Sequence, residues 1–334
     1  MFTALFNSFE SGMIYAIMAL GVYLTFRILD FPDMTVDGSF VTGASVSALI
    51  IVNGYSPLIA TLCALAAGFA AGTVTGLLHT KGKINPLLSG ILMMIALYSI
   101  NLRIMGTSNI PLLSENTLMT NIQNAWQKTG LDPLLNGLWT SVGLGDSVPK
   151  TWSVLIVMLL TVLVIKMALS AFLKTEIGLA LRATGDNEAM VKSFSAHTAN
   201  LKVLGLALGN ALVAFSGALV AQYNGFSDIG MGIGIIVIGL ASVIIGEAVF
   251  GAKTIARATL AVIGGAIIYR IVVTFALRFN FLETGDVKLI TALIVIGALI
   301  IPQVSERRKV RSRKKKRLKE LKFSHVAALK KEAQ

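Results

Sequence analysis

The chain has 334 residues, of which 55% are hydrophobic and only 14% are charged, and its formal net charge is +12. Soluble domains carry about 25% charged residues, so this composition excludes a large water-soluble enzyme and is typical of a membrane protein. The single cysteine, Cys63, excludes an intrachain disulfide and gives no support to a metal site built on thiolates.

Apolar segments long enough to cross a bilayer recur along the chain. About 20 apolar residues cross the hydrocarbon layer as a helix whose backbone groups are paired internally. We therefore predict an all-α, polytopic membrane helical bundle of about nine spans, in which broken or re-entrant segments are expected. The expected spans are residues 8–28, 38–53, 57–78, 86–105, 152–173, 203–223, 231–250, 258–277 and 288–302. The sequence does not decide whether 38–53 and 231–250 cross fully or re-enter.

A basic tail follows the last predicted span and sets the expected orientation. Residues 303–334 hold 13 of the 29 Lys and Arg residues and 3 of the 17 acidic residues, and so carry +10 of the net charge of +12. The positive-inside rule places this tail in the cytoplasm, and counting back through nine spans places the N-terminus outside. We divide the chain into a transmembrane domain, 1–302, and a cytoplasmic tail, 303–334, which we expect to contact anionic lipid and not nucleic acid.

Two polar breaks interrupt the apolar pattern. The first break, FPDMTVDG (31–38), follows the first span, and the second break, FSDIGMGIG (226–234), follows the sixth. Each is followed five residues later by another glycine, Gly43 or Gly239. Span counting puts the first break near the cytoplasmic side and the second near the outside, as an inverted repeat requires. Chance similarity of short glycine-rich segments is the alternative.

Charged side chains in or beside the spans are candidates for a substrate pathway, because they are costly in lipid and usually face protein or water. In the breaks, Asp33, Asp37 and Asp228 either cap helices or line the pathway. Arg270 lies well inside its span, where it either pairs with a substrate carboxylate or forms an internal salt bridge. The candidate pathway residues are Phe31, Asp33, Asp37, Asp228 and Arg270.

Two loops are longer than turns. The external loop, 106–150, contains Trp126 and Trp139, and either docks a partner or carries interfacial helices with aromatic anchors. In the cytoplasmic loop, 174–202, Gly178 and Gly185 bracket a short helix, and Asp186 or Asn187 is placed to cap a second one. The second helix combines a polar rim with an apolar knob that suits a groove on a soluble protein; an ordinary solvated loop is the alternative. The predicted knob is Ala189, Met190, Val191 and Phe194.

The cytoplasmic loop carries a family resemblance. Its pattern of Gly178, Arg182, Ala183, Gly185, Asn187 and Ala189 resembles the coupling loop of the branched-chain amino acid and ribose permease superfamily of bacterial ABC importers. The segments GMIYAIMALGVYL from Gly12 and LDFPDMTVDGSFVTGA from Leu29 resemble a subgroup usually paired with receptors for tryptophan or tyrosine. The resemblance covers about residues 8–302. One departure is Ser195-Ala196, where many relatives carry Gly-Ile.

The resemblance implies a homodimeric permease subunit in a bacterial cell membrane, which takes up an amino acid delivered by an external substrate-binding protein. A separate ATPase subunit, which binds ATP and Mg²⁺, would contact Gly178, Arg182, Ala183, Gly185, Asp186, Asn187, Glu188 and Ala189. The chain itself is expected to be no enzyme and to hold no cofactor or metal. Its near-match to a phosphate-binding loop, GEAVFGAKT from Gly246, has Ala252 where lysine is required.

Two expectations from the residues complete the hypothesis. An ion-coupled secondary transporter of small polar solutes is the alternative function, with Asp33, Asp228 and Arg270 as its buried ionisable groups. The histidines, His79, His197 and His325, have no neighbouring Cys or His at metal-ligand spacing. We expect all three to be surface residues.

Overall fold

The computed structural model describes residues 2–141, 149, 151–195 and 197–276, together with 289, 292, 293, 296, 297 and 300. Within these residues, eight helices are long and apolar enough to cross a membrane. They confirm the predicted all-α, polytopic bundle. The basic tail and most of the predicted span 288–302 lie outside the described residues.

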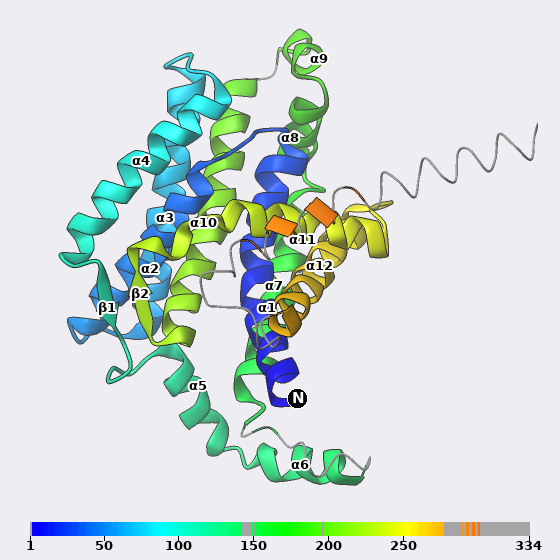
Figure 1. Cartoon of the computed structure of the whole chain (residues 1–334). Helices are drawn as coiled ribbons and strands as arrows, with labels where there is room; N and C mark the ends of the chain where they lie inside the picture. The colour runs from blue at the N-terminus through cyan, green and yellow to red at the C-terminus, as the bar shows by residue number, and fades with distance from the viewer. Residues whose placement is uncertain are drawn as a thin grey trace, which may run out of the picture.

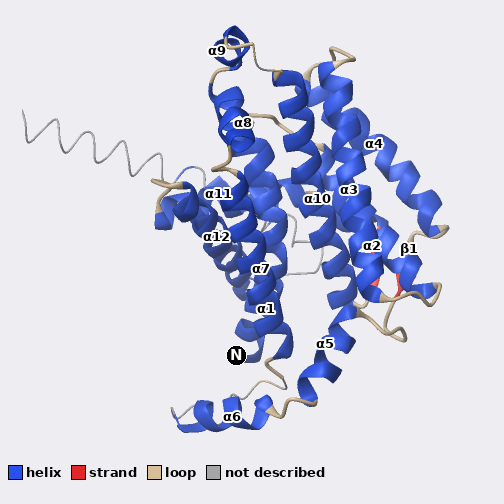
Figure 2. Cartoon of the chain, turned by 180° about the vertical axis from the view of Figure 1, so that it is seen from behind, coloured by secondary structure: helices blue, strands red, loops and turns tan. Residues whose placement is uncertain are grey.

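The spanning helices pack side by side, and short helices lie at both ends (Figures 1 and 2). The first half of the chain comprises α1 (Phe2–Val22), a π-helical turn (Tyr23–Ile28), α2 (Thr35–Val52), α3 (Pro57–Thr80), α4 (Pro86–Met105), β1 (Asn109–Pro111), α5 (Leu118–Gln127) and α6 (Leu131–Ser141). The second half comprises α7 (Ser153–Phe172), α8 (Glu176–Asp186), α9 (Glu188–Ser193), α10 (Thr198–Asn224), β2 (Phe226–Asp228), a 3₁₀ turn (Ile229–Gly232), α11 (Ile235–Phe250) and α12 (Ile255–Ala276).

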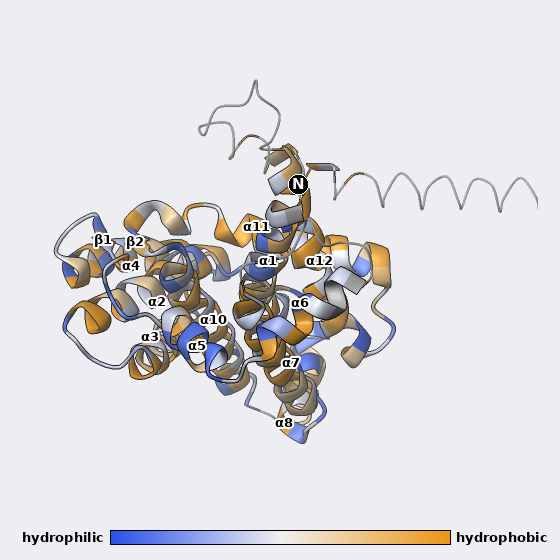
Figure 3. Cartoon of the chain, turned by 90° about the horizontal axis from the view of Figure 1, so that it is seen from below, coloured by the Kyte–Doolittle hydropathy of each residue, from blue (hydrophilic) through white to orange (hydrophobic). Residues whose placement is uncertain are grey.

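The external loop forms helices at the end of the molecule opposite α9 (Figure 1). Viewed from that end, α5 is mostly hydrophilic (Figure 3). Trp126 Nε1 donates to Asp132 Oδ1 at 2.8 Å, and this bond ties α5 to α6. The loop therefore contains helices, while both alternatives for its role, anchoring at the membrane interface and docking of a partner, stay predictions.

The centre of the bundle is the crossing of α2 and α10. A Cβ atom added to Gly43 on α2 would clash with the carbonyl of Ala214 on α10, and one added to Gly217 on α10 would clash with the carbonyl of Phe40 on α2. The two backbones are therefore in direct contact, a packing that small residues permit in membrane helices. This contact fixes the position of α2 and hence of the breaks beside it.

The first break is shorter than predicted, because residues 35–38 form the first turn of α2. Polar side chains are tolerated there because they have partners inside the protein. The hydroxyls of Thr35 and Thr75 are 2.9 Å apart, and Ser39 Oγ donates to Asn210 Oδ1 at 2.7 Å. The polar residues of the sequence therefore predicted a longer irregular segment than the structure contains.

The second break returns the chain into the bundle. Its strand β2 pairs antiparallel with β1, with Asp228 opposite Asn109, and the following 3₁₀ turn packs along α2, where Gly232 lies against the carbonyl of Asp37. As a result α11 begins among buried side chains, with Ile235 only 3% exposed. The predicted span 231–250 is thus a broken segment, of which only Ile235–Phe250 is α-helix.

Asp37 joins the two breaks. Its carboxylate accepts hydrogen bonds from the backbone N–H groups of Gly234 at 3.0 Å and Ile236 at 2.8 Å. The first N–H groups of a helix have no partner within the helix, and inside a membrane no water replaces one. Asp37 supplies the missing acceptors, so α11 starts within the bundle.

The two breaks share one local turn, which supports their predicted similarity. Asp33 Oδ1 accepts from the N–H of Thr35 at 3.0 Å, and Asp228 Oδ1 accepts from the N–H of Gly230 at 2.7 Å. In both breaks an aspartate accepts from the amide two residues later and begins a helical segment. These contacts give Asp33 and Asp228 a local structural role at the start of a helical segment, while the lining of a substrate pathway by the aspartates stays a prediction.

Replacing Asp37 by alanine tests this arrangement. Asp37→Ala leaves two part-buried amides without acceptors, and we expect it to lower the free energy of unfolding by about 2–6 kcal/mol, since each orphaned donor costs about 1–3 kcal/mol. Unfolding by SDS titration from a mild detergent, followed by circular dichroism, measures the change. Asp228→Ala, which removes an acceptor from one partly exposed amide, is the matched control with the smaller expected loss. Equal losses in the two variants would contradict the role given to Asp37.

Candidate functional site

The loop 174–202, which the sequence analysis places in the cytoplasm, forms two short helices, α8 and α9, that project from one end of the bundle (Figure 1). Thr175 caps α8 by accepting from the N–H of Gly178 at 3.2 Å, and Asn187 caps α9 by accepting from the N–H of Met190 at 3.0 Å. Asn187, and not Asp186, is therefore the cap of the second helix. The predicted pair of helices is confirmed.

Glycines hold α8 against the bundle. A Cβ atom on Gly185 would clash with the carbonyl of Ile28, and one on Gly178 would clash with the carbonyl of Phe172. Leu181, between them, is fully buried. The glycine spacing of the predicted coupling loop thus has a packing reason, because α8 lies directly on the π-helical turn that follows α1 and on the end of α7.

The outer side of α9 is exposed and apolar. Met190 is 46% and Phe194 is 77% exposed, and Ala189 is exposed beside them. We call these three side chains the α9 surface. Val191, which the sequence placed in the same knob, is only 5% exposed; that assignment is wrong, because a helical residue one position after Met190 turns toward the bundle.

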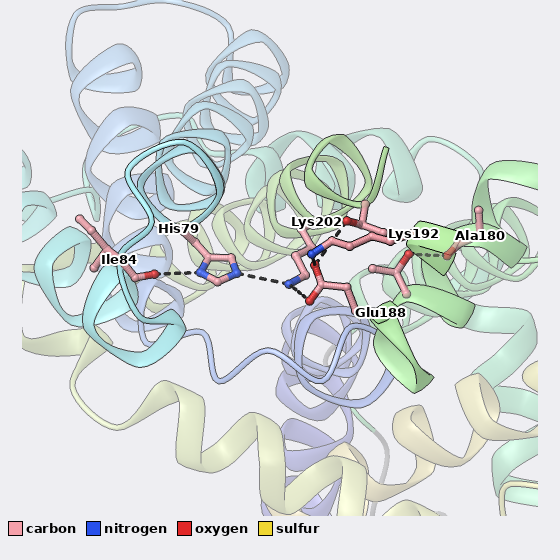
Figure 4. Close-up of polar contacts among 8 residues, drawn as sticks. His79, Ile84, Ala180, Glu188, Lys192 and Lys202 are labelled. Atoms are coloured by element: carbon pink, nitrogen blue, oxygen red, sulfur yellow. Dashed lines mark hydrogen bonds and ion pairs between the residues drawn. The ribbon is translucent and has the colours of Figure 1, made fainter. Parts of the chain in front are cut away.

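Glu188 anchors α9 to the bundle (Figure 4). Its carboxylate forms ion pairs with Lys202 Nζ on α10 at 2.8 Å and with Lys192 Nζ at 3.1 Å. Lys202 Nζ also lies 3.3 Å from His79 Nε2 at the end of α3. Three helices are therefore held together by one lysine.

His79 is half-buried and bonded on both ring nitrogens, and this differs from the surface position we expected. Its Nδ1 lies 2.9 Å from the carbonyl oxygen of Ile84, which can only accept, so Nδ1 carries the proton and Nε2 accepts from Lys202. The ring packs edge-on against Phe31, with centroids 5.3 Å apart. His79 therefore connects the anchor of α9 to the first break.

The first break is linked in turn to the middle of α10. Asn210 Nδ2 donates to Asp33 Oδ2 at 2.6 Å, and Asp33 and Asn210 are almost completely buried. The sequence analysis missed Asn210, Lys202 and His79. The available signal was Asn210 within the apolar stretch 203–215 of α10, because a buried amide needs a polar partner.

Two polar cavities adjoin α8, and Arg182 lines both of them. One, of about 760 Å³, also contains Arg27, Asp30 and Asp186. The other, of about 640 Å³, contains Arg27, Lys174, Lys253 and Glu247. Glu247 pairs with Arg27 at 3.0 Å. The excess of cationic side chains in the second cavity suits an acidic group of a partner.

Ser195 ends the α9 segment in a left-handed conformation, with φ of +61°. Glycine adopts this conformation without steric cost, whereas other residues pay about 1 kcal/mol or more. Ser195 stands at the position where the family resemblance predicts glycine. It keeps the backbone conformation that glycine favours. Ala196 lies outside the described residues.

The predicted pathway residues do not form one cluster. Asp37 lines a cavity of about 430 Å³ between the two breaks. Phe31 and Asp33 pack toward His79 and Asn210. Arg270 lies between α12 and α1, with its guanidinium 4.1 Å from the centroid of the Tyr15 ring and Nε 3.4 Å from Ser11 Oγ. Among the described residues Arg270 has no ion pair, so the two alternatives for it, an internal salt bridge and a substrate carboxylate, both stay predictions.

Known proteins show where this architecture belongs. The family model described as the permease component of branched-chain amino acid transport systems matches residues 4–302. The chain belongs to this permease family. The tyrosine transport system permease protein of Clostridioides difficile (strain R20291) is 46% identical over 288 residues, which cover 86% of this chain and 88% of that protein. The ribose import permease protein of Escherichia coli (strain K12) is 25% identical over 216 residues, which cover 64% of this chain and 60% of that protein.

A solved ABC transporter in an inward-facing conformation is also similar, with 17% identity, a TM-score of 0.48, and coverage of 91% of this permease and 85% of that chain. The family match makes this chain an ABC transporter permease, a multi-pass membrane protein. It argues against the alternative of an ion-coupled secondary transporter.

The anchor of the permease α9 helix should be insensitive to pH above about 5. The hydrogen bond from Lys202, together with Lys192, lowers the pKa of the Glu188 carboxyl to about 2, against about 4.3 in an unfolded chain. A lowered pKa means that the ion pair stabilises α9 fully above about pH 4.3 and is lost as the pH falls toward 2.

A spin label on Met190→Cys, in a Cys63→Ala background, reports through its mobility how firmly α9 is held to the bundle at each pH. We expect constant label mobility from pH 8 to 5 and increasing mobility below about pH 4, whereas Glu188→Gln should be mobile throughout. A label on Tyr55→Cys, in a turn distant from α9 in the sequence, is the control. A mobility change centred near pH 6 would show that another group holds α9.

Proposed function

We propose that this permease is the transmembrane subunit of an importer for an aromatic amino acid, tyrosine or tryptophan. An external substrate-binding protein delivers the amino acid, and a separate ATPase subunit, which binds ATP and Mg²⁺, drives its passage. The name of the 46% identical tyrosine transport permease supports the substrate class. The permease itself carries out no ATP hydrolysis and needs no cofactor.

The observation that carries the proposal is the α9 surface. Large apolar side chains exposed at the tip of a projecting helix are characteristic of a helix that inserts into a groove on a partner. Phe194 and Met190 are such side chains, and the cationic cavity beside α8, the helix that precedes α9, offers a polar contact. The ATPase subunit is the partner to which we assign both features.

Movement of the ATPase reaches the membrane through the anchor of α9. Glu188, Lys202 and His79 link α9 to α10, α3 and the first break by direct contacts. A partner shifts the permease between two states only if it binds the two states with different affinity. ATP-dependent closure of two ATPase subunits on two permease copies supplies that difference.

The proposed setting is a bacterial cell membrane, with two copies of the permease around a central pathway. The N-terminus lies at the end of the bundle opposite α9 (Figure 1), and this supports an outside N-terminus once α9 is assigned to the cytoplasm. The basic tail, 303–334, then contacts anionic lipid on the cytoplasmic side.

Ala189→Arg tests the assignment of α9. A cationic side chain on the α9 surface cannot enter an apolar groove without a desolvation cost, so we expect at least a ten-fold loss of amino acid uptake and loss of co-purification with the ATPase. Asn200→Arg, on an exposed residue in the first turn of α10 that lines neither cavity beside α8, is the control and should keep both. Membrane abundance should be normal in both variants. Normal uptake by Ala189→Arg would refute the coupling role of α9.

A further inference from the structure

The cavity of about 640 Å³ beside α8 holds more positive than negative charge. The π-helical turn after α1, the loop before α8, α8 itself, the end of α11 and the start of α12 all contribute to its walls. Its charged lining residues are four cations and one carboxylate, namely Arg27, Lys174, Arg182, Lys253 and Glu247. A cavity of this size and charge suits an anionic group.

Most of the cationic groups in this cavity have no partner. Among the described residues, the side chains of Lys174, Arg182 and Lys253 form no hydrogen bond or ion pair. Arg27 uses only Nε, which donates to Glu247 Oε1 at 3.0 Å, and its side chain is 60% exposed. The two Nη groups of Arg27 therefore stay available for another acceptor.

The neighbouring cavity of about 760 Å³ does not remove this charge excess. Arg27 and Arg182 line it as well, together with Asp30 and Asp186. Within the described part of the chain, neither aspartate forms an ion pair with these arginines. The two lysines line only the larger-charge cavity beside α11 and α12, so the cationic side of both arginines faces that cavity.

Glu247 shows that a carboxylate fits against Arg27. It lies in the last turn of α11, where the helix dipole disfavours a negative charge, so its position does not serve the stability of α11 itself. Its pairing with a largely exposed arginine is weak. A carboxylate that approaches the free Nη groups forms two parallel hydrogen bonds, which are stronger than one. Such a carboxylate can therefore replace Glu247 at Arg27.

We propose that an acidic side chain of the ATPase subunit enters this cavity, binds Arg27 through its Nη groups beside Arg182, and releases Glu247. The proposal rests on the proposed function, which it deepens by naming the acidic contact and the residue that competes with it. The ATPase is the occupant because two of the cations, Lys174 and Arg182, belong to the same loop, 174–202, that carries the α9 surface.

Release of Glu247 changes how α11 is held. The start of α11 is bound by Asp37 on α2, and its last turn is bound to the π-helical turn by the ion pair of Glu247 and Arg27. Docking of the acidic side chain removes the second link and leaves the first in place. The partner thereby acts on α11 in addition to the anchor of α9.

Removing the two ends of the ion pair in turn tests the proposal. Full-length permease variants in phosphatidylcholine nanodiscs are titrated with the ATPase subunit that co-purifies with the wild type, and Kd is measured. Arg27→Gln removes the acceptor site of the acidic side chain and should raise Kd at least about ten-fold, as expected for a hydrogen bond to a charged group. Glu247→Gln removes the competitor and should lower Kd by about two- to five-fold, because an exposed ion pair is weak.

The opposite signs separate docking from a structural role, because both variants break the same ion pair and should lower thermal stability equally. The double variant Arg27→Gln/Glu247→Gln should resemble Arg27→Gln. Glu176→Gln is the matched control for net charge, since Glu176 is exposed on α8 and lines neither cavity; it should leave Kd unchanged.

Each other outcome counts against the docking. A rise of Kd in both single variants, no change in Arg27→Gln, or an equal fall in Glu247→Gln and Glu176→Gln would overturn it, although the wild type binds the ATPase. Effects that appear only in nanodiscs with phosphatidylglycerol would assign the cavity to a lipid headgroup and overturn it as well. Absence of ATPase binding by the wild-type permease would refute the proposed function, and the docking with it.

Discussion

The carboxylate of Asp37 allows a helix to begin inside the membrane-spanning bundle. Without an internal acceptor, the first amides of α11 would require water, and the chain would have to start this helix at the membrane surface. Because Asp37 accepts from Gly234 and Ile236, the second break ends beside α2. The cavity between the breaks exists for the same reason, since the residues that return into the bundle form one of its walls.

The sequence predicted those features whose causes are local. Asn187 caps α9 through the amide three residues later, and the same short pattern is visible in the sequence. Asp37 was identifiable as a polar residue in a break, but its partner amides lie 197 and 199 positions away, so its role depends on tertiary structure. The contact of Asn101 was not predictable either, because its bond to Gly38 spans 63 positions. Val191 and Met190 on α9 were also not distinguishable from the sequence. Both are apolar, and only packing against the bundle makes Val191 buried and Met190 exposed.

The ion pairs that anchor α9 have short distances but contribute little to the free energy of folding. Lys192 is 61% exposed in its side chain and Glu188 is 35% exposed, and ion pairs of this kind contribute at most about 1 kcal/mol. Lys202 is better shielded, at 16%, and it also contacts His79. The anchor therefore positions α9 relative to α3 and α10 and leaves most of the stability of the bundle to helix packing. Because the anchor contributes little to stability, α9 can move with a partner while the membrane core stays folded.

A permease that receives its substrate from a dedicated binding protein has no need of a tight site within the membrane. Tight binding there would slow release, since passage requires a site that is favourable enough to enter and weak enough to leave.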